Sequence, residues 1–501
     1  MKKVDLVQPQ LNVLNPDQIE FLHDRSLQIL SSTGLRVDSP RARQVFKKSV
    51  GVRIADDDRV FLERDLVEWA IKAAPSSIDI FDRNGEFAFR LGEENLISDY
   101  QQTSPSSNLP PQQFANLPMS QSVPRFGIGV TNLYFQDPMT EKVTPFSRKH
   151  MGLSVRLGDH LPNYDLISTV GVVQDFPPDI ADLFAVLEMV ANTTKPLVIL
   201  ISNEGLFLPA LDLLESLHVD LSCHPFVIPY FNPITPLIIN RSTGDKLLDA
   251  ILRGLPVIYS NFSMAGMSTP ITAAGTLALL NAELLAGLTL SQLARGGSPM
   301  ILGSLPAFFD MKTMQDFYDP HTILMNLACA EMMAYYRIPH AGTSGSGAGW
   351  GADLLGGGLL WINHLTSCMG KVGLVPFVGG NLGSKVFSPA LAVYSNEIIG
   401  QARRLAKGFS LNSDWLDLEE IERKGPGGNF LDAKLTIKLF REAYLESDIF
   451  PHLSLEKWET RGQPHAEQLL REYTNQLLTS NQPPDEHDEM IMKGEAFIKR
   501  L

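Results

Sequence analysis

The stretch from residue 225 to residue 262 decides the fold, because it reads as a strand, a helix and a strand in succession. It begins with the apolar run PFVIPYF (Pro225–Phe231), continues with DKLLDAIL (Asp245–Leu252), and ends with LPVIYSNF (Leu255–Phe262). Short apolar runs rich in β-branched and aromatic residues predict buried strands. A strand followed by a helix and another strand indicates parallel strands joined by a crossover helix.

The same alternation extends in both directions along the chain. We expect strands at 128–135, 165–173, 195–202, 225–231, 255–262, 299–309, 338–343 and 374–379. Between them, helical spacing occurs at 179–192, 207–217, 245–252, 273–293, 321–336 and 353–370. Eight strands with intervening helices predict an α/β protein with a (β/α)₈ TIM-type barrel.

Segments outside the barrel have a different composition. We divide the chain into an N-terminal helical and mixed extension with a loop (1–125), the barrel (126–405), a C-terminal helical appendage (406–480) and a polar tail (481–501). Helices are expected at 17–32 and 62–74, and later at 417–422, 433–447 and 465–478. Residues 101–124 are rich in Gln, Ser, Asn and Pro, which predicts a long loop.

Charge and cysteine content exclude several classes of protein. The chain of 501 residues has a net charge of −14 and no long basic run, so we expect no nucleic-acid and no anionic-membrane partner. Three scattered cysteines predict reduced thiols and a cytoplasmic location. The apolar run 271–290 contains one charged residue, Glu283, and much Ala, Gly and Thr, which favours a buried helix over a membrane span.

The usual catalytic motifs are missing. The sequence contains no H-E-x-x-H, C-x-x-C or H-x-H pattern and no G-x-S-x-G pattern, so we expect neither a bound metal nor a serine hydrolase. A glycine-rich stretch at 341–351 lacks the context of a dinucleotide fingerprint. We therefore expect no tightly bound cofactor on this chain.

Aromatic and amide residues gather at the expected strand ends, where barrel enzymes carry their sites. We predict an aromatic cage formed by Tyr230 and Phe231 with Phe308 or Phe309 opposite. Such faces attract a quaternary ammonium through cation–π interaction. The further candidates at these ends are Asn232, Asp310 and His340. The alternative is that the aromatic residues only cap the barrel core.

The glycine-rich stretch follows an expected strand and precedes an expected helix. Glycines allow a ligand close to the backbone, and a helix start offers N–H donors to an anion. We expect Gly345, Gly347, Gly349 and Trp350 to line the site and to receive a substrate carboxylate. His340, just before them, is the expected side-chain donor.

Several blocks together resemble the trimethylamine methyltransferase family. The most specific is GMSTPITAAGT (Gly266–Thr276) running into NAELLAG (Asn281–Gly287). Weaker blocks are NPITPL (Asn232–Leu237), GSLPAFFDM (Gly303–Met311), NEI (Asn396–Ile398) and GPGGNFL (Gly425–Leu431), in the family's order.

The resemblance implies a barrel that moves a methyl group from an amine to the cobalt of a separate corrinoid protein. It also implies an alternative role for the glycine-rich stretch, which could contact the edge of the corrinoid instead of the substrate carboxylate. Two departures from the family stand out. The chain lacks the pyrrolysine of the archaeal trimethylamine enzymes, and Leu355 and Leu359 replace the Gln and Glu of an Asp-x-Gln-x-Gly-x-Glu run that begins here at Asp353.

The chemistry favours a quaternary amine. A methyl group leaving a quaternary ammonium releases a neutral tertiary amine, so neither an acid nor a base is expected. The leading hypothesis is methyl transfer from a betaine-like amine to Co(I) of a corrinoid protein, by a chain that also associates with copies of itself. The alternatives are a non-catalytic betaine-binding barrel and a barrel lyase acting on a small acid.

Overall fold

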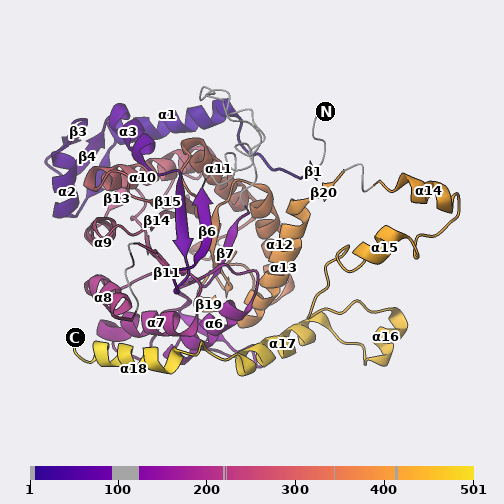
Figure 1. Ribbon diagram of the computed structural model, residues 1–501. Helices are drawn as coiled ribbons and strands as arrows, with labels where there is room; N and C mark the ends of the chain where they lie inside the picture. The colour runs from indigo at the N-terminus through magenta and orange to yellow at the C-terminus, as the bar shows by residue number, and fades with distance from the viewer. Residues whose placement is uncertain (1–5, 93–122, 218–220, 222, 344, 412–415) are drawn as a thin grey trace.

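The computed structural model describes residues 6–92, 123–217, 221, 223–343, 345–411 and 416–501. Residues 101–122 of the expected long loop and Ser344 therefore lie outside the described residues. The described part forms a closed barrel, with an N-terminal layer on one side and a C-terminal segment that runs along another (Figure 1).

The barrel wall consists of parallel strands in chain order. They are β7 (Arg125–Ile128), β10 (Leu166–Ser168), β11 (Leu197–Ile199), β12 (Val227–Phe231), β14 (Val257–Ala265), β15 (Met300–Asp310) and β17 (Leu374–Val378). The eighth position, between β15 and β17, is occupied by two residues. His340 pairs with Leu302, and Ala341 pairs with Leu374. Because β17 also pairs with β7, the sheet closes on itself.

Helices surround this wall. They are α6 (Arg148–His160), α7 (Pro178–Asn192), η1 (Glu204–Leu206) with α8 (Phe207–Leu217), α9 (Arg241–Leu252), α10 (Ala273–Ala294), α11 (Pro320–Tyr336), α12 (Leu354–Met369) and α13 (Pro389–Lys407). The predicted (β/α)₈ barrel is confirmed. Helix α10 is long and apolar enough to cross a membrane, but 78% of its most apolar window is buried, as in a core helix.

The first ninety residues form a layer against α9, α10 and α11. This layer contains α1 (Pro16–Ser32), β2 (Leu35–Val37), α2 (Pro40–Lys47), β3 (Val52–Ile54), β4 (Arg59–Leu62) and α3 (Arg64–Ala73). Strand β13 (Ile238–Ile239), from the loop after β12, pairs with β2. The layer is therefore attached to the barrel through shared backbone hydrogen bonds as well as side-chain packing.

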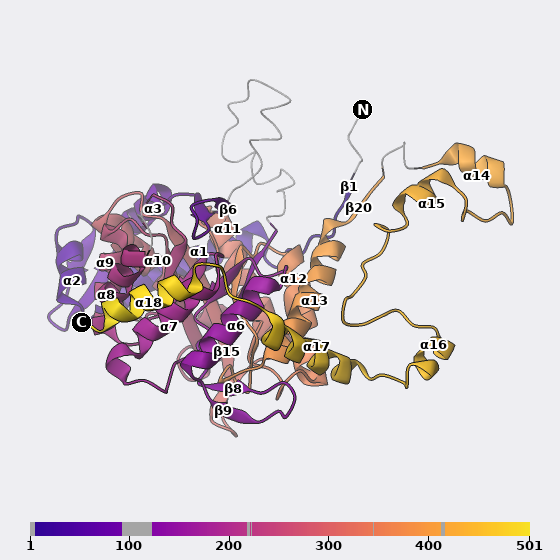
Figure 2. The ribbon, with the colours of Figure 1, turned by 60° about the horizontal axis from the view of Figure 1, so that its bottom comes forward.

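A hairpin plugs the end of the barrel at which the strands begin. Strands β5 (Ser77–Phe81) and β6 (Phe87–Gly92) place Ile78, Ile80, Phe89 and Leu91 in one buried cluster with the inward residues of the wall. Backbone N–H groups of the hairpin bond to carbonyls that precede β11 and β12. Figure 2 shows β6 of the plug at one end of the barrel and β8 and β9 at the other.

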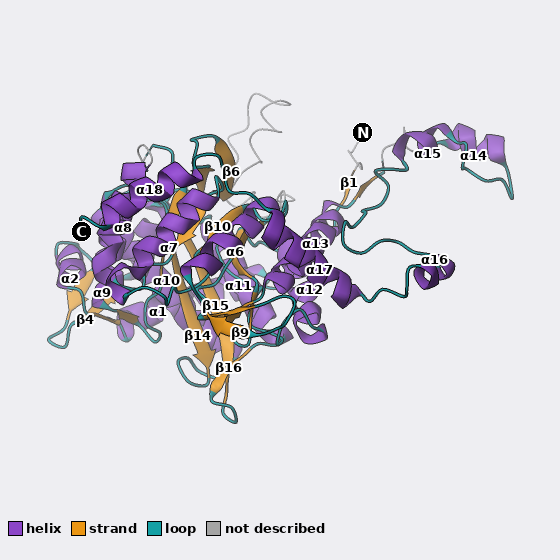
Figure 3. Ribbon diagram, turned by 90° about the horizontal axis from the view of Figure 1, so that it is seen from below, coloured by secondary structure: helices purple, strands orange, loops and turns teal. Residues whose placement is uncertain are grey.

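The open end carries additional strands. Strands β8 (Tyr134–Gln136), β9 (Val143–Pro145), β18 (Gly380–Asn381) and β19 (Val386–Phe387) form a small sheet. Strand β15 continues past the barrel and turns back as β16 (Gln315–Phe317), so the hairpin projects from this face (Figure 3). The first barrel strand was expected at 128–135, but the chain divides this segment between β7 and β8.

The C-terminal part begins with the pairing of β20 (Phe409–Ser410) with β1 (Leu6–Val7). It continues with α14 (Leu418–Lys424), α15 (Lys434–Leu439), α16 (Leu455–Thr460) and α17 (Ala466–Ser480). The helix expected at 433–447 is limited to α15. Residues 481–501, expected as a polar tail, contain helix α18 (His487–Ile498), which packs on α7 and α8.

Helix α18 is held by one close contact and by charge. A Cβ atom at Gly494 would lie 2.3 Å from Cδ1 of Leu187, so the helices approach through this glycine. Arg148 pairs with Glu188 of α7 at 2.7 Å and with Glu495 of α18 at 2.8 Å. The helix could not be recognised from the polar composition of the segment. Its few contacts with the body involve residues far away in the sequence.

We predict that Gly494→Val lowers the free energy of unfolding by about 1–3 kcal/mol, the usual range for overpacking. Valine is a better helix former than glycine, so a loss of stability would come from packing against Leu187. Chemical denaturation measures the change, and Met492→Val on the exposed face of the same helix is the control. Equal stability of the two variants would mean that α18 does not dock on α7.

Candidate functional site

A hollow of about 500 Å³, including its open mouth, lies at the carboxyl end of the barrel. It is bordered by the end of β15, the start of α11, the glycine-rich stretch and α12. Its lining residues are Leu305, Pro306, Tyr318, Thr322, Ile323, Asn326, Gly345, Ser346, Ala348, Leu359, Leu360, Asn363, Gly380 and Leu391. None of these described lining residues is Lys, Arg, His or Cys, so the hollow offers aromatic, apolar and neutral polar groups.

Tyr230 lies inside the barrel at its open end. It belongs to the interior cluster, and its ring meets Phe377 of β17 edge-on at 4.9 Å. The amide nitrogen of Asn232 donates to its hydroxyl at 3.1 Å. Burial raises the pKa of Tyr230, which keeps the hydroxyl neutral. The predicted candidates Tyr230 and Asn232 thus lie together.

Tyr318 provides a second aromatic face. It lines the hollow, and its ring packs so closely on the glycine-rich stretch that a Cβ atom at Gly347 would lie 2.9 Å from Cδ2. Burial, together with the neighbouring Asp316 carboxylate to which its hydroxyl is hydrogen-bonded, raises the pKa of Tyr318. It also interacts electrostatically with Tyr230. We call Tyr230, Tyr318, Phe377 and Asp316 the mouth cluster.

Phe231 was predicted as part of the cage, but it faces away from the barrel interior. Its ring packs against Phe207 of α8 at 5.4 Å, and the ammonium of Lys246 lies 5.9 Å from its centre. Neighbouring residues on a strand point to opposite faces, so Tyr230 and Phe231 cannot both line the mouth. Phe231 is a core residue between the wall and the helices.

Phe308, Phe309 and Asp310 were predicted to lie together at the site. In the hairpin that β15 forms with β16, their side chains have different surroundings. Phe308 faces α11, with its ring 6.0 Å from that of His321. Phe309 lies opposite Asp316 in the antiparallel register and therefore shares the face of that carboxylate. Asp310 accepts from Lys312 N at 2.9 Å and Thr313 Oγ1 at 2.7 Å, so it caps the turn rather than facing the mouth.

His340 was expected to be the side-chain donor, but it points toward α11. Its neighbour Ala341 is the residue that belongs to the interior cluster. A Cβ atom at Gly342 would lie 2.7 Å from His340 Nε2 and 2.9 Å from Asn326 Oδ1. Burial lowers the pKa of His340 to about 3, so the ring is neutral. The neutral ring keeps one N–H donor, and it lies beside Gly342 and Asn326 on the α11 side of the barrel.

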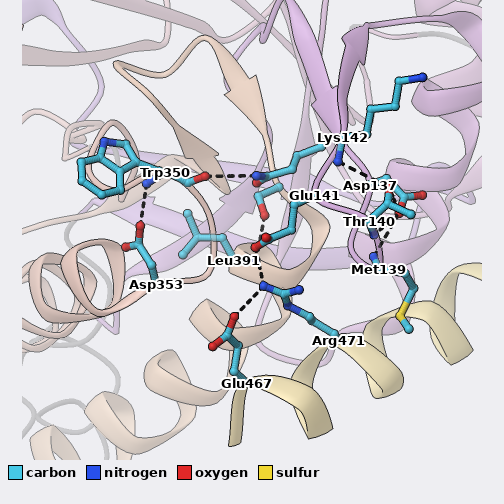
Figure 4. Close-up of polar contacts among 12 residues, drawn as sticks. Asp137, Met139, Thr140, Glu141, Lys142, Trp350, Asp353, Leu391, Glu467 and Arg471 are labelled. Carbon is cyan, nitrogen blue, oxygen red and sulfur yellow. Dashed lines mark hydrogen bonds and ion pairs between the residues drawn. The ribbon is translucent and has the colours of Figure 1, made fainter.

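The glycine-rich stretch borders the hollow, as expected for Gly345, but most of its donors have partners. Gly347 N donates to Gly380 O at 3.0 Å, and Leu382 N donates to Gly349 O at 3.1 Å, so these bonds hold the stretch beside β18 and the turn that follows it. Trp350 is largely exposed, and its N–H donates to Asp353 Oδ2 at 2.8 Å (Figure 4).

Helix α12 does not supply the expected anion site. Asp353 is its N-cap, and its Oδ1 accepts from Gly356 N at 2.8 Å. This carboxylate is already the anion at the helix start, so a second anion would be repelled. The prediction that the stretch receives a carboxylate on backbone N–H groups is therefore wrong for Gly347 and Trp350.

Neutral side chains provide donors elsewhere in the hollow. Asn326 comes from the second turn of α11 and Asn363 from α12, whereas the hydroxyl of Thr322 already donates to Asp319 O at 2.7 Å. Asn326 Oδ1 accepts from Thr343 N at 3.0 Å, which turns its amide nitrogen away from that backbone. Buried amides of this kind can receive a carboxylate without adding charge to the site.

Tyr318, Asp316 and Phe377 were not among the residues predicted for the site. Phe377 carried a usable signal, since it lies in an expected strand next to the barrel end. Tyr318 and Asp316 carried none, because no local pattern indicates that β15 continues into a hairpin. On the other side of the mouth, Asp137 caps the β8–β9 turn and Arg471 of α17 pairs with Glu141 (Figure 4).

Comparison with known proteins was made by family and by individual relatives. The family described as trimethylamine methyltransferase matches residues 1–108 and 136–501. The glycine betaine methyltransferase of Desulfitobacterium hafniense strain Y51 is 25% identical over 98% of this chain and 97% of its own. A trimethylamine methyltransferase of Desulfitobacterium hafniense strain DSM 10664 / DCB-2 is 24% identical over 93% and 89%.

An archaeal relative and a solved structure show more distant similarity. The trimethylamine methyltransferase of Methanosarcina barkeri strain Fusaro is 25% identical over 86% of this chain and 83% of its own. The crystal structure of the Methanosarcina barkeri monomethylamine methyltransferase gives a TM-score of 0.48 at 9% identity, covering 94% and 88% of the two chains. On the family match over most of its length, the chain belongs to the trimethylamine methyltransferase family and is a methyltransferase.

Proposed function

We propose that this methyltransferase takes a methyl group from a small quaternary amine of the betaine class and passes it to a corrinoid carried by a separate protein. The observation that carries the proposal is the mouth cluster, in which aromatic faces and one carboxylate meet at the open end of a plugged barrel. The similarity to a glycine betaine methyltransferase supports the same substrate class.

The mouth cluster suits a cation that has no N–H donors. A quaternary ammonium cannot form hydrogen bonds through its nitrogen, so its recognition depends on ring faces and on charge. The Asp316 carboxylate beside Tyr318 places a negative charge close to the aromatic ring. Phe309 shares the face of Asp316 and completes the same side.

The neutral lining suits the other end of a betaine. A carboxylate taken out of water must find hydrogen-bond donors. A Lys or Arg could provide them, but its positive charge would repel the ammonium of the same ligand. Asn326 and Asn363 offer neutral donors on the α11 and α12 side of the hollow. The mouth cluster, which reaches the hollow through Tyr318, is aromatic and acidic, and the hollow's lining from α11 and α12 is polar and neutral, which matches a zwitterion.

The reaction makes little demand on proton transfer. When the carbon–nitrogen bond breaks, its electron pair stays on nitrogen, and the product is a neutral tertiary amine. The Co(I) of the corrinoid supplies the nucleophile for the methyl carbon. The residues of this chain orient the ammonium, exclude water and keep their own protons, since burial holds the hydroxyls of Tyr230 and Tyr318 in the neutral form.

The rim of the hollow suits a macromolecular acceptor. Exposed apolar side chains occur on both sides of it: Met311, Met314 and Phe317 on the hairpin, and Trp350, Leu354 and Leu355 on the opposite side. Leu354 is 95% exposed. Aromatic and methionine side chains are typical of protein interfaces, and docking on this rim would bring a carried cofactor to the mouth.

The departure from the family run has a structural consequence. Leu359, in the position of the family's Glu, lines the hollow, whereas Leu355 is exposed on the rim. The carboxylate lost at Leu359 leaves Asp316 as the acid nearest the aromatic faces. This favours a substrate held by ring faces over one that needs a hydrogen-bond acceptor on α12.

We predict that Tyr318→Ala weakens binding of glycine betaine about tenfold, because one face of the ammonium site is lost. Tyr318→Phe keeps the ring and should lose much less. Isothermal titration calorimetry measures both. Tyr335→Ala removes an exposed tyrosine on α11, away from the hollow, and should leave the affinity unchanged. Unchanged affinity in Tyr318→Ala would contradict the proposed cage.

A second prediction separates charge from shape. Asp316→Asn should weaken glycine betaine roughly two- to fivefold, the range for a partly exposed ion pair. It should not weaken 3,3-dimethylbutyrate, which replaces the ammonium nitrogen by carbon and carries no positive charge. The ratio of the two affinities is the readout. An equal loss for both ligands would show that Asp316 only supports the shape of the site.

The reaction itself is tested with the purified chain, Co(I) cobalamin and a panel of quaternary and tertiary amines. We expect the methylcobalamin spectrum to appear with at least one betaine and not with trimethylamine, because the neutral amine lacks a good leaving group. The matched control is the Tyr318→Ala variant under the same conditions. Turnover of trimethylamine without turnover of any quaternary amine would overturn the proposal.

A further inference from the structure

Helix α10 places a charge in the core beside the barrel wall. Glu283 is the only charged residue in the sequence of α10, which packs on β14 (Figure 1), and its side chain is 3% exposed. Within the described part of the chain, no Lys, Arg or His forms an ion pair with it. A buried charge is costly unless several hydrogen bonds replace the water that it has lost. The partners of this carboxylate therefore indicate what it holds together.

The carboxylate accepts three hydrogen bonds from two segments of the barrel. Its Oε1 accepts from Leu237 N at 2.6 Å, and its Oε2 accepts from Thr235 Oγ1 and from Asn261 Nδ2, each at 2.8 Å. Thr235 and Leu237 belong to the loop that follows β12, whereas Asn261 belongs to β14, the next strand of the wall. Glu283 therefore ties the exit of one barrel strand to its neighbour.

The loop needs this tie because its backbone is strained. Leu237 has a φ of 57°, in the left-handed region that costs a residue with a side chain more than it costs glycine. On both sides of it, Ile234 and Ile238 exchange backbone hydrogen bonds at 2.9 and 3.0 Å, which closes a tight turn. The bond from Leu237 N to Glu283 lies within this turn and helps to keep its conformation.

The same two segments hold the hydroxyl of Tyr230 in the mouth cluster. Asn232, the first residue of the loop, donates to it from Nδ2 at 3.1 Å, and Ser260 of β14 interacts with the same hydroxyl. Ser260 and Asn261 are neighbours on a strand, so when Ser260 faces Tyr230 inside the barrel, Asn261 faces α10. The residues that hold Tyr230 therefore lie on the two segments that Glu283 joins.

We propose that Glu283 is a positioning residue for the mouth cluster. By tying the loop 232–237 to β14, it fixes the two partners of the Tyr230 hydroxyl and so the position of that ring. Glu283 is not among the described residues that line the hollow, so it acts on a substrate only through Tyr230. The inference rests on the proposed function, in which the Tyr230 ring faces the ammonium of the substrate.

Glu283→Gln keeps the shape of the side chain and removes one acceptor. If the new NH₂ group takes the place of Oε1, it faces Leu237 N, and if it takes the place of Oε2, it faces Asn261 Nδ2. Either orientation brings two donors together, so one link between the loop and β14 is lost. Measurements at about pH 8.5 compare this amide with an ionised carboxylate, because burial raises the pKa of Glu283 to about 7.

A double-mutant cycle with Tyr230 separates positioning from general support of the fold. We expect Glu283→Gln to weaken glycine betaine about three- to tenfold by isothermal titration calorimetry, because one ring face of the ammonium site is displaced. In the Tyr230→Phe background, which lacks the hydroxyl, the same change should weaken binding less than about twofold. An equal loss in both backgrounds, or no loss in either, would overturn the proposal.

Fluorine NMR reads the position of Tyr230 without any ligand. With Tyr230 replaced by 3-fluorotyrosine, the single resonance should shift or broaden in Glu283→Gln and stay unchanged in Glu331→Gln. Glu331 is the matched control, a buried carboxylate of α11 that accepts from Val13 N and Leu14 N, both at 2.6 Å, in the N-terminal segment. An unchanged resonance in Glu283→Gln, or the same change in Glu331→Gln, would contradict the proposed role.

The fluorine measurement also covers the case in which the substrate is not a quaternary amine. If the wild-type chain binds none, the proposed function fails, and the resonance of the labelled Tyr230 alone decides the role of Glu283. Circular dichroism and unfolding midpoints show whether each variant is folded. Thr235→Val, which removes one donor to the carboxylate, replaces Glu283→Gln if that variant does not fold, and it should change the resonance in the same direction.

Discussion

The closure of the barrel depends on a close backbone approach at two glycines. A Cβ atom at Gly303 would lie 1.4 Å from Ala341 O, and one at Gly373 would lie 2.6 Å from His340 O. Any side chain at Gly303 would push away the two residues that bridge β15 to β17. Because that bridge is only two residues long, the chain leaves the wall at once and enters the glycine-rich stretch beside the mouth. The residues that close the barrel therefore lead directly into the stretch that borders the site.

Much of the fold could be predicted because its elements carry local signals. The apolar runs from 165 to 309 and the helices between them lie close to the observed bounds, since each run is short, buried and flanked by turns. The polar segment that forms α18 could not be recognised, because its anchors, Leu187 and Arg148, are distant in the sequence. The continuation of β15 into a hairpin was missed for the same reason: its pairing partner follows a turn that resembles an ordinary loop.

The site could be predicted in part. The wrong assignments of Phe231 and His340 have one geometric origin. A strand end identifies a position, but only the alternation along the strand decides which side chain enters the mouth. Tyr230 enters and Phe231 does not, and Ala341 enters while His340 does not. Applying the alternation from the inward residue Ile228 would have assigned Tyr230 correctly and excluded Phe231. No such rule finds Tyr318, because it reaches the hollow from the segment after a hairpin.

The two ends of the barrel differ in structure. Segments from both ends of the chain close one of them, and the other carries the candidate site. The plug fills the interior of the barrel at one end, together with the inward side chains of the wall. Arg83 at the end of β5 is almost fully buried, donates to Val190 O of α7 at 2.6 Å and pairs with Glu486 beside α18 at 3.3 Å. Removing Glu486 would leave the buried guanidinium of Arg83 with fewer partners, so the C-terminal segment helps to hold the N-terminal plug. The mouth has no comparable lock among its described residues; it is formed by a hairpin, a glycine-rich stretch and an apolar rim. The N-terminal plug and the C-terminal segment therefore act together at the closed end, and the hollow lies at the opposite end of the barrel.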